Sequence, residues 1–316
     1  MKRFLRMFTV LCLSLLLVGV SACDSPFNKG EKEETISAAE GYAAVKVAAV
    51  DTLKEATGIS LKCLANFEAK VYNSDEDKAA GILTAQSGTI DLCLEIKANS
   101  ERIITEQCAW AKIDSNEGGK LDNLTLESYL KDGYRYTFSN LKLFNKEAPD
   151  YYQYEAEEPS DTFDVQDIDL EQVSMYIDKF SEEFPEPVAT TKNGEITLTW
   201  TINKDNIIDY VTAFNVVVNN EEKEAARAKA EEDLGGIDLQ VNKGVLTLKV
   251  KDNQIASLAL ELDAAYDGQS VKVSFDISVA YNTFAMSYPL ERMEEIKQTY
   301  LAKKAEEEAA NGTPNE

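Results

Sequence analysis

The sequence predicts an α+β fold in which one strongly curved antiparallel sheet, a half-barrel, packs against inserted helices, with further helices near the amino and carboxyl ends. Long segments alternate apolar and polar residues, short turn sequences join them, and apolar segments with helical spacing interrupt them. Strands joined by short turns run antiparallel. Because their apolar faces must be buried, the helices are expected to cover the sheet.

The first 22 residues have the organisation of a secretory signal. Basic residues precede an apolar run over 7–20 that is shorter than a membrane-spanning helix requires. The run ends in Val-Ser-Ala-Cys, which resembles the bacterial lipobox. That resemblance implies that residues 1–22 are removed as a lipoprotein signal peptide and that Cys23 carries a diacylglyceryl group with acyl chains such as palmitate. An ordinary secretory signal is the alternative.

Charge and composition exclude several classes of function. The chain has 316 residues, with 32 Lys and Arg, 56 Asp and Glu, and no histidine, for a formal charge of -24. Removal of residues 1–22 takes away three basic residues, which leaves -27. Such an acidic body repels nucleic acid. Without histidine, and without a phosphate loop or nucleophile motif, we predict no enzyme, no cofactor and no metal site.

Residues 23–34 are expected to form the lipid-bearing cysteine and a flexible tether, because 24–34 are polar and have little to bury. A single domain over 35–301 follows. Apolar residues at helical spacing predict its first helix over 35–56, with Gly58 as the stop. This apolar stripe is rich in small residues, so the helix can lie close against a sheet.

Alternating sequences predict a run of antiparallel strands after this helix, over 60–72, 88–98 and 103–113. A further alternating segment over 124–138 contains Asp132 and Gly133. This pair is a strong signal for a two-residue hairpin, because both turn positions favour positive φ.

Three cysteines remain in the body, in a compartment that permits disulfides: Cys63, Cys93 and Cys108. If the strands over 87–98 and 102–113 pair so that residue numbers sum to 201, Cys93 lies directly opposite Cys108. That register would allow a bridge at a site with close side chains. Three reduced and partly buried cysteines are the alternative, and the sequence does not decide between the two.

The middle of the chain begins with an acidic excursion over 147–167 that prolines interrupt. Asp169 can then cap a helix that ends before Pro185 and has large apolar residues on one face. A strand is expected over 195–202. Asn203 can cap a second helix, and the charged stretch over 221–233 is typical of a solvated helical face.

The last part of the body alternates again, and it predicts strands over 245–250, 255–265 and 271–281. Polar turn sequences separate these strands. Pro289 begins a final helix, because proline is favoured in the first turn. Residues 302–316 are expected to be a polar tail that frays.

The order of these elements resembles that of the bacterial half-barrel lipoproteins, the LolA/LolB lipoprotein carriers and the LppX-type lipid-binding lipoproteins of mycobacteria. The resemblance is carried by a lipobox cysteine, a first helix, the hairpin YLKDGYRY, inserted apolar helices, and the closing strands KDNQIASLALEL and VKVSFDISVAYNTF. It covers most of residues 35–290. Those families hold acyl chains in the apolar concavity between a curved sheet and its helices.

The resemblance implies an apolar lining drawn from one strand and one helix: Ile90, Leu92, Leu94, Ile96, Val173, Ile177, Phe180 and Phe184. The chain is thus expected to be an extracytoplasmic lipoprotein, anchored to a bacterial cell membrane by its lipid, that binds a lipid or other hydrophobic ligand non-covalently. A structural or protein-interaction lipoprotein of the cell envelope, with a filled interior, is the alternative. The sequence names no protein partner.

Overall fold

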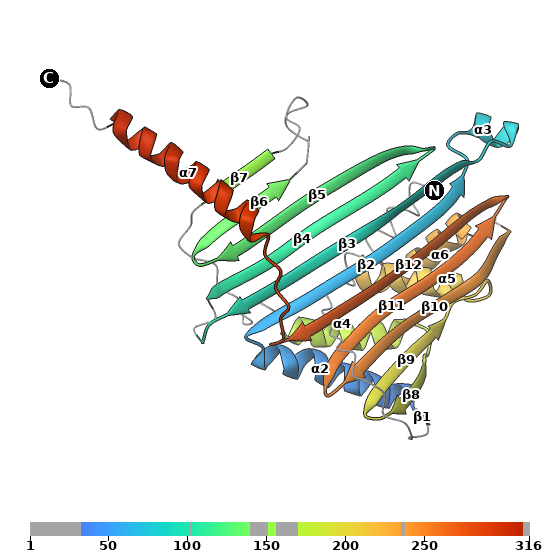
Figure 1. Ribbon diagram of the computed structural model, residues 1–316. Coiled ribbons are helices and arrows are strands. Elements are labelled where there is room, and N and C mark those ends of the chain that lie inside the picture. The colour runs from blue at the N-terminus through green and yellow to red at the C-terminus, as the bar shows by residue number, and fades with distance from the viewer. Residues whose placement is uncertain (1–32, 101–102, 140–150, 156–169, 235–237, 312–316) are drawn as a thin grey trace.

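The computed structural model describes residues 33–100, 103–139, 151–155, 170–234 and 238–311. It confirms an α+β fold built on an antiparallel sheet (Figure 1). The sheet has 12 strands in the order β1-β8-β9-β10-β11-β12-β2-β3-β4-β5-β6-β7. It is open, with β1 and β7 at its two edges, and every pair of neighbouring strands is antiparallel.

One half of the sheet follows the predicted meander as far as residue 139, with strands longer than the alternating sequence alone indicates. Its last strand lies within the acidic excursion over 147–167, where no strand was expected. Its strands are β2 (Gly58–Val71), β3 (Thr84–Ala98), β4 (Ile104–Glu117), β5 (Lys120–Lys131), β6 (Tyr134–Ser139) and β7 (Tyr151–Glu155). Asp132 and Gly133 have φ values of 52° and 79°, so the predicted two-residue hairpin between β5 and β6 is confirmed.

The other half is a second meander, which returns to the first because β12 pairs with β2. Its strands are β8 (Val188–Lys192), β9 (Glu195–Thr201), β10 (Leu239–Lys251), β11 (Gln254–Tyr266) and β12 (Gln269–Tyr281). Tight turns with positive φ join β8 to β9, β10 to β11 and β11 to β12, among them Asn193-Gly194 and Asp267-Gly268, whereas two helices lie between β9 and β10. The apolar alternation does not predict β8, because only Val188 and Ala189 in it are apolar.

The helices lie on both faces of the sheet. They are α2 (Ala38–Glu55), α3 (Asp75–Ala80), α4 (Leu170–Glu183), α5 (Ile207–Val218), α6 (Lys223–Leu234) and α7 (Leu290–Asn311). Figure 1 shows α2, α4, α5 and α6 behind the sheet and α7 in front of β5, β6 and β7. We call the face toward α2 and α4 the inner face, and the opposite one the outer face.

The first helix begins three residues later than the predicted boundary at residue 35. Ser37 accepts a hydrogen bond from the backbone N–H of Glu40, and Glu40 accepts one from the backbone N–H of Ser37. This capping box fixes the start of α2 at Ala38. The preceding residues form β1 (Glu34–Ile36), which pairs with β8, so Glu34 belongs to the sheet rather than to the predicted tether.

Two other helix ends differ from the prediction. The helix expected to be capped by Asn203 begins at Ile207. Asn203 instead accepts hydrogen bonds from the backbone N–H groups of Asp205 and Asn206, so it caps the turn before the helix. At the carboxyl end, α7 continues to Asn311, past the predicted tail boundary at 302. The alanine and glutamate of this segment favour helix, which accounts for the extension.

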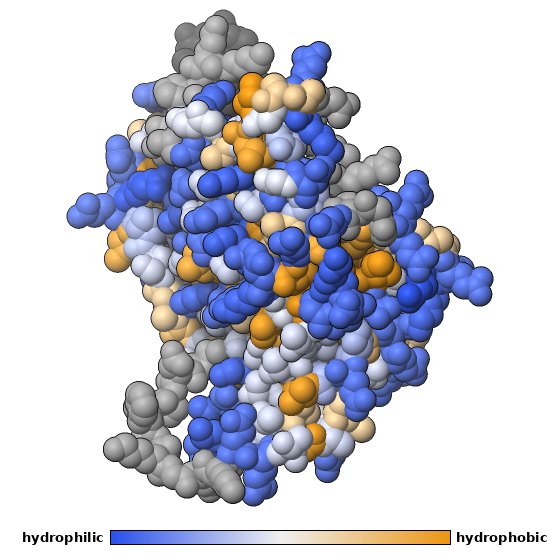
Figure 2. All heavy atoms as spheres, turned by 90° about the vertical axis from the view of Figure 1, so that its right-hand side faces the viewer, coloured by the Kyte–Doolittle hydropathy of each residue, from blue (hydrophilic) through white to orange (hydrophobic). Residues whose placement is uncertain are grey.

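The charged stretch over 221–233 forms α6 and is a solvated helical face, as predicted. Ala226 and Ala230 are its buried residues, and α6 packs through them beside α5. Ion pairs at the surface join it to other helices, from Lys223 to Glu183 and from Arg227 to Asp209. On the side of the molecule in Figure 2, hydrophilic residues predominate and hydrophobic ones form small separate areas.

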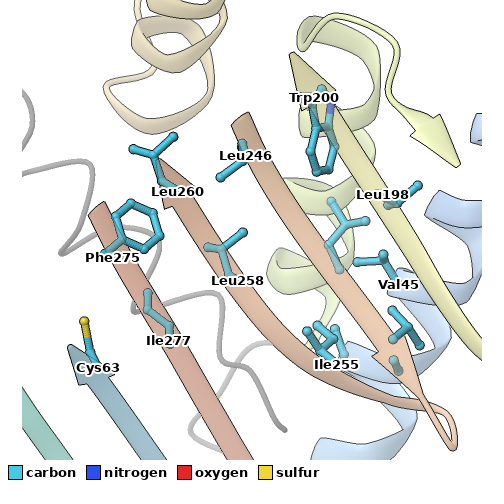
Figure 3. Packing of buried hydrophobic residues seen from close by; sticks show 14 of the residues in the cluster. Val45, Cys63, Leu198, Trp200, Leu246, Ile255, Leu258, Leu260, Phe275 and Ile277 are labelled. Carbon is cyan, nitrogen blue, oxygen red and sulfur yellow. The ribbon is translucent and has the colours of Figure 1, made fainter. Parts of the chain in front are cut away.

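The main core lies between the inner face and the helices. Directly paired residues share a face, so the register creates apolar rows across the sheet. One row runs Leu198, Leu248, Leu258, Ile277, Cys63 and Leu92. Figure 3 shows side chains of this core on the same side of their strands. A Cβ atom on Gly41 of α2 would lie 2.4 Å from Leu198 Cδ2, which shows how closely this helix approaches β9.

Truncation of a core residue in β12 should be costly. Ile277→Ala is expected to lower the free energy of unfolding by about 2–5 kcal/mol, because the side chain is fully buried and its loss leaves a cavity. Ser278→Ala, on the outer face of the same strand, should change it by about 0.5 kcal/mol or less. Urea unfolding of both variants measures the difference, and equal losses would contradict the assignment of the two faces.

Candidate functional site

The structure brings most of the predicted lining residues together on the inner side. Ile90, Leu92 and Leu94 of β3 contribute to the main core, and so do Val173, Ile177 and Phe180 of α4 and Phe184 directly after it. Ile96 is on the same face of β3, opposite Ile59, but outside this cluster. Strand and helix therefore contribute to one apolar interior, although they are far apart in the sequence.

Aromatic side chains fill the space between α4 and β9. Phe180 stacks on Phe184 with ring centroids 3.8 Å apart, and it meets Trp200 edge-on at 5.7 Å. Tyr42 of α2 and Tyr210 of α5 complete the group, which we call the inner aromatic cluster. Trp200 is 1% exposed. The helix residues of the predicted lining are thus core contacts in this part of the molecule.

Burial on the inner face decreases along the sheet. Over β9 to β12 most of the inner residues are buried, as Leu198, Leu260 and Phe275 show. The same rows continue onto β3, β4 and β5, where the residues are apolar but only half-buried and Leu126 is 41% exposed. We call these residues the inner apolar strip: Ile90, Leu92, Leu94, Ala111, Ile113 and Leu126.

The helix layer explains this gradient. α2 packs against β8 to β11, and α4 lies between α2 and α5. These helices therefore cover the half of the inner face that belongs to the second meander. A contiguous apolar surface that remains partly exposed is typical of a site for a ligand or a partner.

The register of β3 and β4 corrects the proposed disulfide. Cys93 is opposite Trp110, and Cys108 is opposite Glu95, so the paired residue numbers sum to 203 rather than 201. The two cysteines are diagonal neighbours on the outer face and not a direct pair. A bulge at the end of the hairpin, between Lys97 and Ala98, shifts the pairing. Cys63, Cys93 and Cys108 are free thiols.

A second cluster lies on the outer face, and sequence periodicity did not predict it. Cys108, Tyr129, Tyr136 and Phe138 of β4 to β6 pack against Met293 of α7, with Trp110, Tyr288 and other residues around them. We call it the outer aromatic cluster. The chain after β12 crosses this cluster before it enters α7, and residues 282–296 form what we call the carboxyl-terminal arm.

Two buried carboxylates fasten the carboxyl-terminal arm to the sheet. Glu95, which is 1% exposed, accepts hydrogen bonds from Ser60 Oγ and the backbone N–H of Ala285, and it pairs with Lys62. Glu127 accepts a hydrogen bond from Arg292, whose guanidinium also lies 3.9 Å from the ring centroid of Phe138. The alternating sequence predicted only that both acids lie in strands. It did not predict their contacts with the arm, because Ala285 and Arg292 are distant in the sequence.

No group of three or more cysteine, aspartate or glutamate side chains within the described ranges is arranged to hold a metal ion. Among the same residues, no helix has both the length and the apolar character needed to cross a membrane.

The chain matches no protein-family model and no curated protein. Among solved structures, an inactive mutant of CurK dehydratase is 9% identical with a TM-score of 0.15, over 84% of this chain and 99% of that one. The dehydratase domain from the CurK module of curacin polyketide synthase is 8% identical with a TM-score of 0.13, over 85% of this chain and 99% of that one. TM-scores this low carry no argument about fold or function.

The three thiols should be inert in the folded protein. Burial raises the pKa of Cys63 to about 11 and that of Cys93 to about 12, and it also raises the pKa of Cys108. Since the thiolate is the reactive form, a disulfide reagent at pH 8 should modify none of them before unfolding and all three after it. The assay uses Cys23→Ser protein without the signal peptide. Rapid modification of Cys93 in the native state would contradict its burial.

Proposed function

We propose that this chain is an extracytoplasmic lipoprotein, anchored to a bacterial cell membrane through Cys23, that binds an acyl chain or lipid non-covalently between its curved sheet and its helices. Residues 1–32, which include the signal peptide, Cys23 and most of the tether, lie outside the described residues, so the anchor rests on the lipobox and the apolar run before it. A half-barrel of the LolA/LolB or LppX type is part of this proposal.

The inner apolar strip is the observation that carries the proposal. Leu92, Ala111 and Leu126 form one row across β3, β4 and β5, and Ile90 and Ile113 are paired in the next row. An acyl chain lying along such a surface would gain about 0.8 kcal/mol for each methylene that it buries. The strip continues the main core without a break, so a ligand there would contact both the sheet and the core side chains.

The inner aromatic cluster occupies one of the positions that this ligand could take. Phe180, Phe184 and Trp200 fill the space that the predicted lining assigned to the helix side. We therefore place the ligand against β3 to β5 rather than between α4 and β9. The same cluster also favours the second candidate function, a structural or protein-interaction lipoprotein, because a well-filled interior needs no ligand.

A charge in the inner apolar strip should weaken lipid binding. Leu126→Glu places a carboxylate where the ligand would lie, and its desolvation should weaken binding of a fluorescent fatty acid by about tenfold or more. Leu64→Glu is the matched control, since Leu64 is a mid-strand leucine on the outer face and is 53% exposed. Both are made in Cys23→Ser protein without the signal peptide, and probe fluorescence gives the dissociation constants.

Organic extracts of the purified wild-type body, analysed by mass spectrometry, provide an independent measurement. A co-purifying lipid that Leu126→Glu loses and Leu64→Glu retains is the expected result. No bound lipid and no affinity for the probe would favour the structural or interaction lipoprotein instead.

The anchor has a separate test. Cys23→Ala should abolish incorporation of labelled palmitate and leave the precursor uncleaved by the lipoprotein signal peptidase, because the thiol is the site of acylation. Cys63→Ala is the matched control and should be labelled like the wild type. Metabolic labelling followed by gel analysis measures both. Normal labelling of the Cys23→Ala chain would exclude lipidation at this position.

A further inference from the structure

The two ends of the inner apolar strip differ in charge. Successive strand residues alternate between the faces, so the register assigns each residue of β2 to β6 to one face. Toward the β4–β5 turn, the inner face carries Glu117 and Asp122, both exposed, with Lys120 opposite Glu117. Toward the β5–β6 turn, the charged residue on the inner face of these five strands is Arg135, which is half-buried. A negatively charged group therefore meets a favourable charge at one end of the strip.

Uncharged hydrogen-bonding groups lie between Arg135 and the strip. Ser128 and Thr137 are directly paired on β5 and β6, and Arg135 is the diagonal neighbour of Ser128. Diagonal neighbours are about 7–8 Å apart, which is within reach of a long side chain. Gln107 of β4 contacts Ser128, with Nε2 and Oγ 3.5 Å apart. We call Gln107, Ser128, Thr137 and Arg135 the polar end of the strip.

The distance between the polar end and the far end of the strip suits one acyl chain. On β5, Leu124 is opposite Ile113 of the strip. Leu130, six residues farther along, is opposite Arg135. Six residues of strand span about 20 Å, at about 3.4 Å per residue. An acyl chain spans about half of the roughly 30 Å hydrocarbon core of a bilayer, which is about 15 Å. One chain therefore covers the apolar rows while its headgroup reaches the guanidinium.

We propose that the ligand of the inner apolar strip is a free fatty acid whose carboxylate pairs with Arg135. This inference rests on the proposed function, a lipid bound along the strip. A guanidinium matches a carboxylate with two parallel N–H donors, and it is more weakly hydrated than an ammonium group, which lowers the cost of pairing at a half-buried position. Glu117 and Asp122 repel a carboxylate at the other end, so charge sets the direction in which the ligand lies.

The single guanidinium favours a carboxylate over other headgroups. A phosphate monoester carries about 1.5–2 negative charges at pH 7, more than one guanidinium neutralises, and an alcohol or ester forms no ion pair. Glu155 of β7 is the residue opposite Arg135 in the register. Because a guanidinium has five N–H donors, it can hold a ligand carboxylate in addition to a neighbouring group.

The test compares dodecanoate with dodecanol, which differ in the headgroup alone, in Cys23→Ser protein without the signal peptide. Titration calorimetry at pH 8 should show that dodecanoate binds about tenfold or more tightly than dodecanol, because a hydrogen bond to a charged group is the stronger kind. Arg135→Gln should remove this preference through loss of dodecanoate affinity. Its unchanged affinity for dodecanol would show that the variant is folded.

Lys120→Gln is the matched control, because it removes the cation at the other end of the inner face, and it should keep the wild-type preference. Arg135→Lys keeps a positive charge and should bind dodecanoate more tightly than Arg135→Gln does. Equal affinities of the wild type for the two ligands, or the same preference in Arg135→Gln as in the wild type, would overturn the fatty-acid assignment and leave the hydrophobic site standing.

Tighter binding of dodecyl phosphate than of dodecanoate would overturn the choice of a carboxylate. If neither dodecanoate nor dodecanol binds, the proposed function fails, and the inference about Arg135 fails with it.

Discussion

The pairing of β12 with β2 holds the two halves of this protein together. Twelve residue pairs, from Ser270 with Lys70 to Tyr281 with Ile59, join a strand near the carboxyl end to the first long strand. Both meanders could form locally, but only this contact makes them one sheet. It also sets which apolar residues meet, because Ile277 opposite Cys63 continues a row that begins on β9 and ends on β5. A shift by one residue would turn half of that row to the wrong face.

The joined sheet has two covers, one on each face, and they lie at different ends. The helices cover the inner face over the second meander, whereas the carboxyl-terminal arm covers the outer face over the first. The parts of the two faces that these covers leave bare differ in chemistry. Over β2 and β12, the outer face that no described helix or arm covers carries polar residues such as Asn66 and Lys272, which need no partner. The part of the inner face that no described helix covers carries the inner apolar strip, where burial by an occupant would bring the larger hydrophobic gain in free energy.

Local sequence predicted most of the strands and the β5–β6 hairpin, because alternation and a positive-φ pair such as Asp132-Gly133 act over a few residues. Local sequence did not predict the features that depend on contacts between residues far apart in the chain. Residues 34–36 are a strand only because β8 is there to pair with them. Cys93 and Cys108 are diagonal because the connection after β3 is held by a hydrogen bond from Asn99 N–H to the Ile103 carbonyl and by the bulge beside it. A shift by two residues preserves each face and changes every partner.

The buried acids show how a strongly acidic chain uses a few of its charges. Glu95 and Glu127 are the buried carboxylates within the described ranges, and both lie on the outer face under the carboxyl-terminal arm. Glu95 accepts a hydrogen bond from the backbone N–H of Ala285 in the arm and pairs with Lys62 of β2, and Glu127 pairs with Arg292 of the arm. An ion pair at such a position adds little net stability, since desolvation offsets most of the attraction. An apolar arm would slide over an aromatic surface with small cost, but a buried carboxylate that loses its partner costs several kcal/mol. The two acids therefore fix where the arm lies, and the position of α7 follows from them.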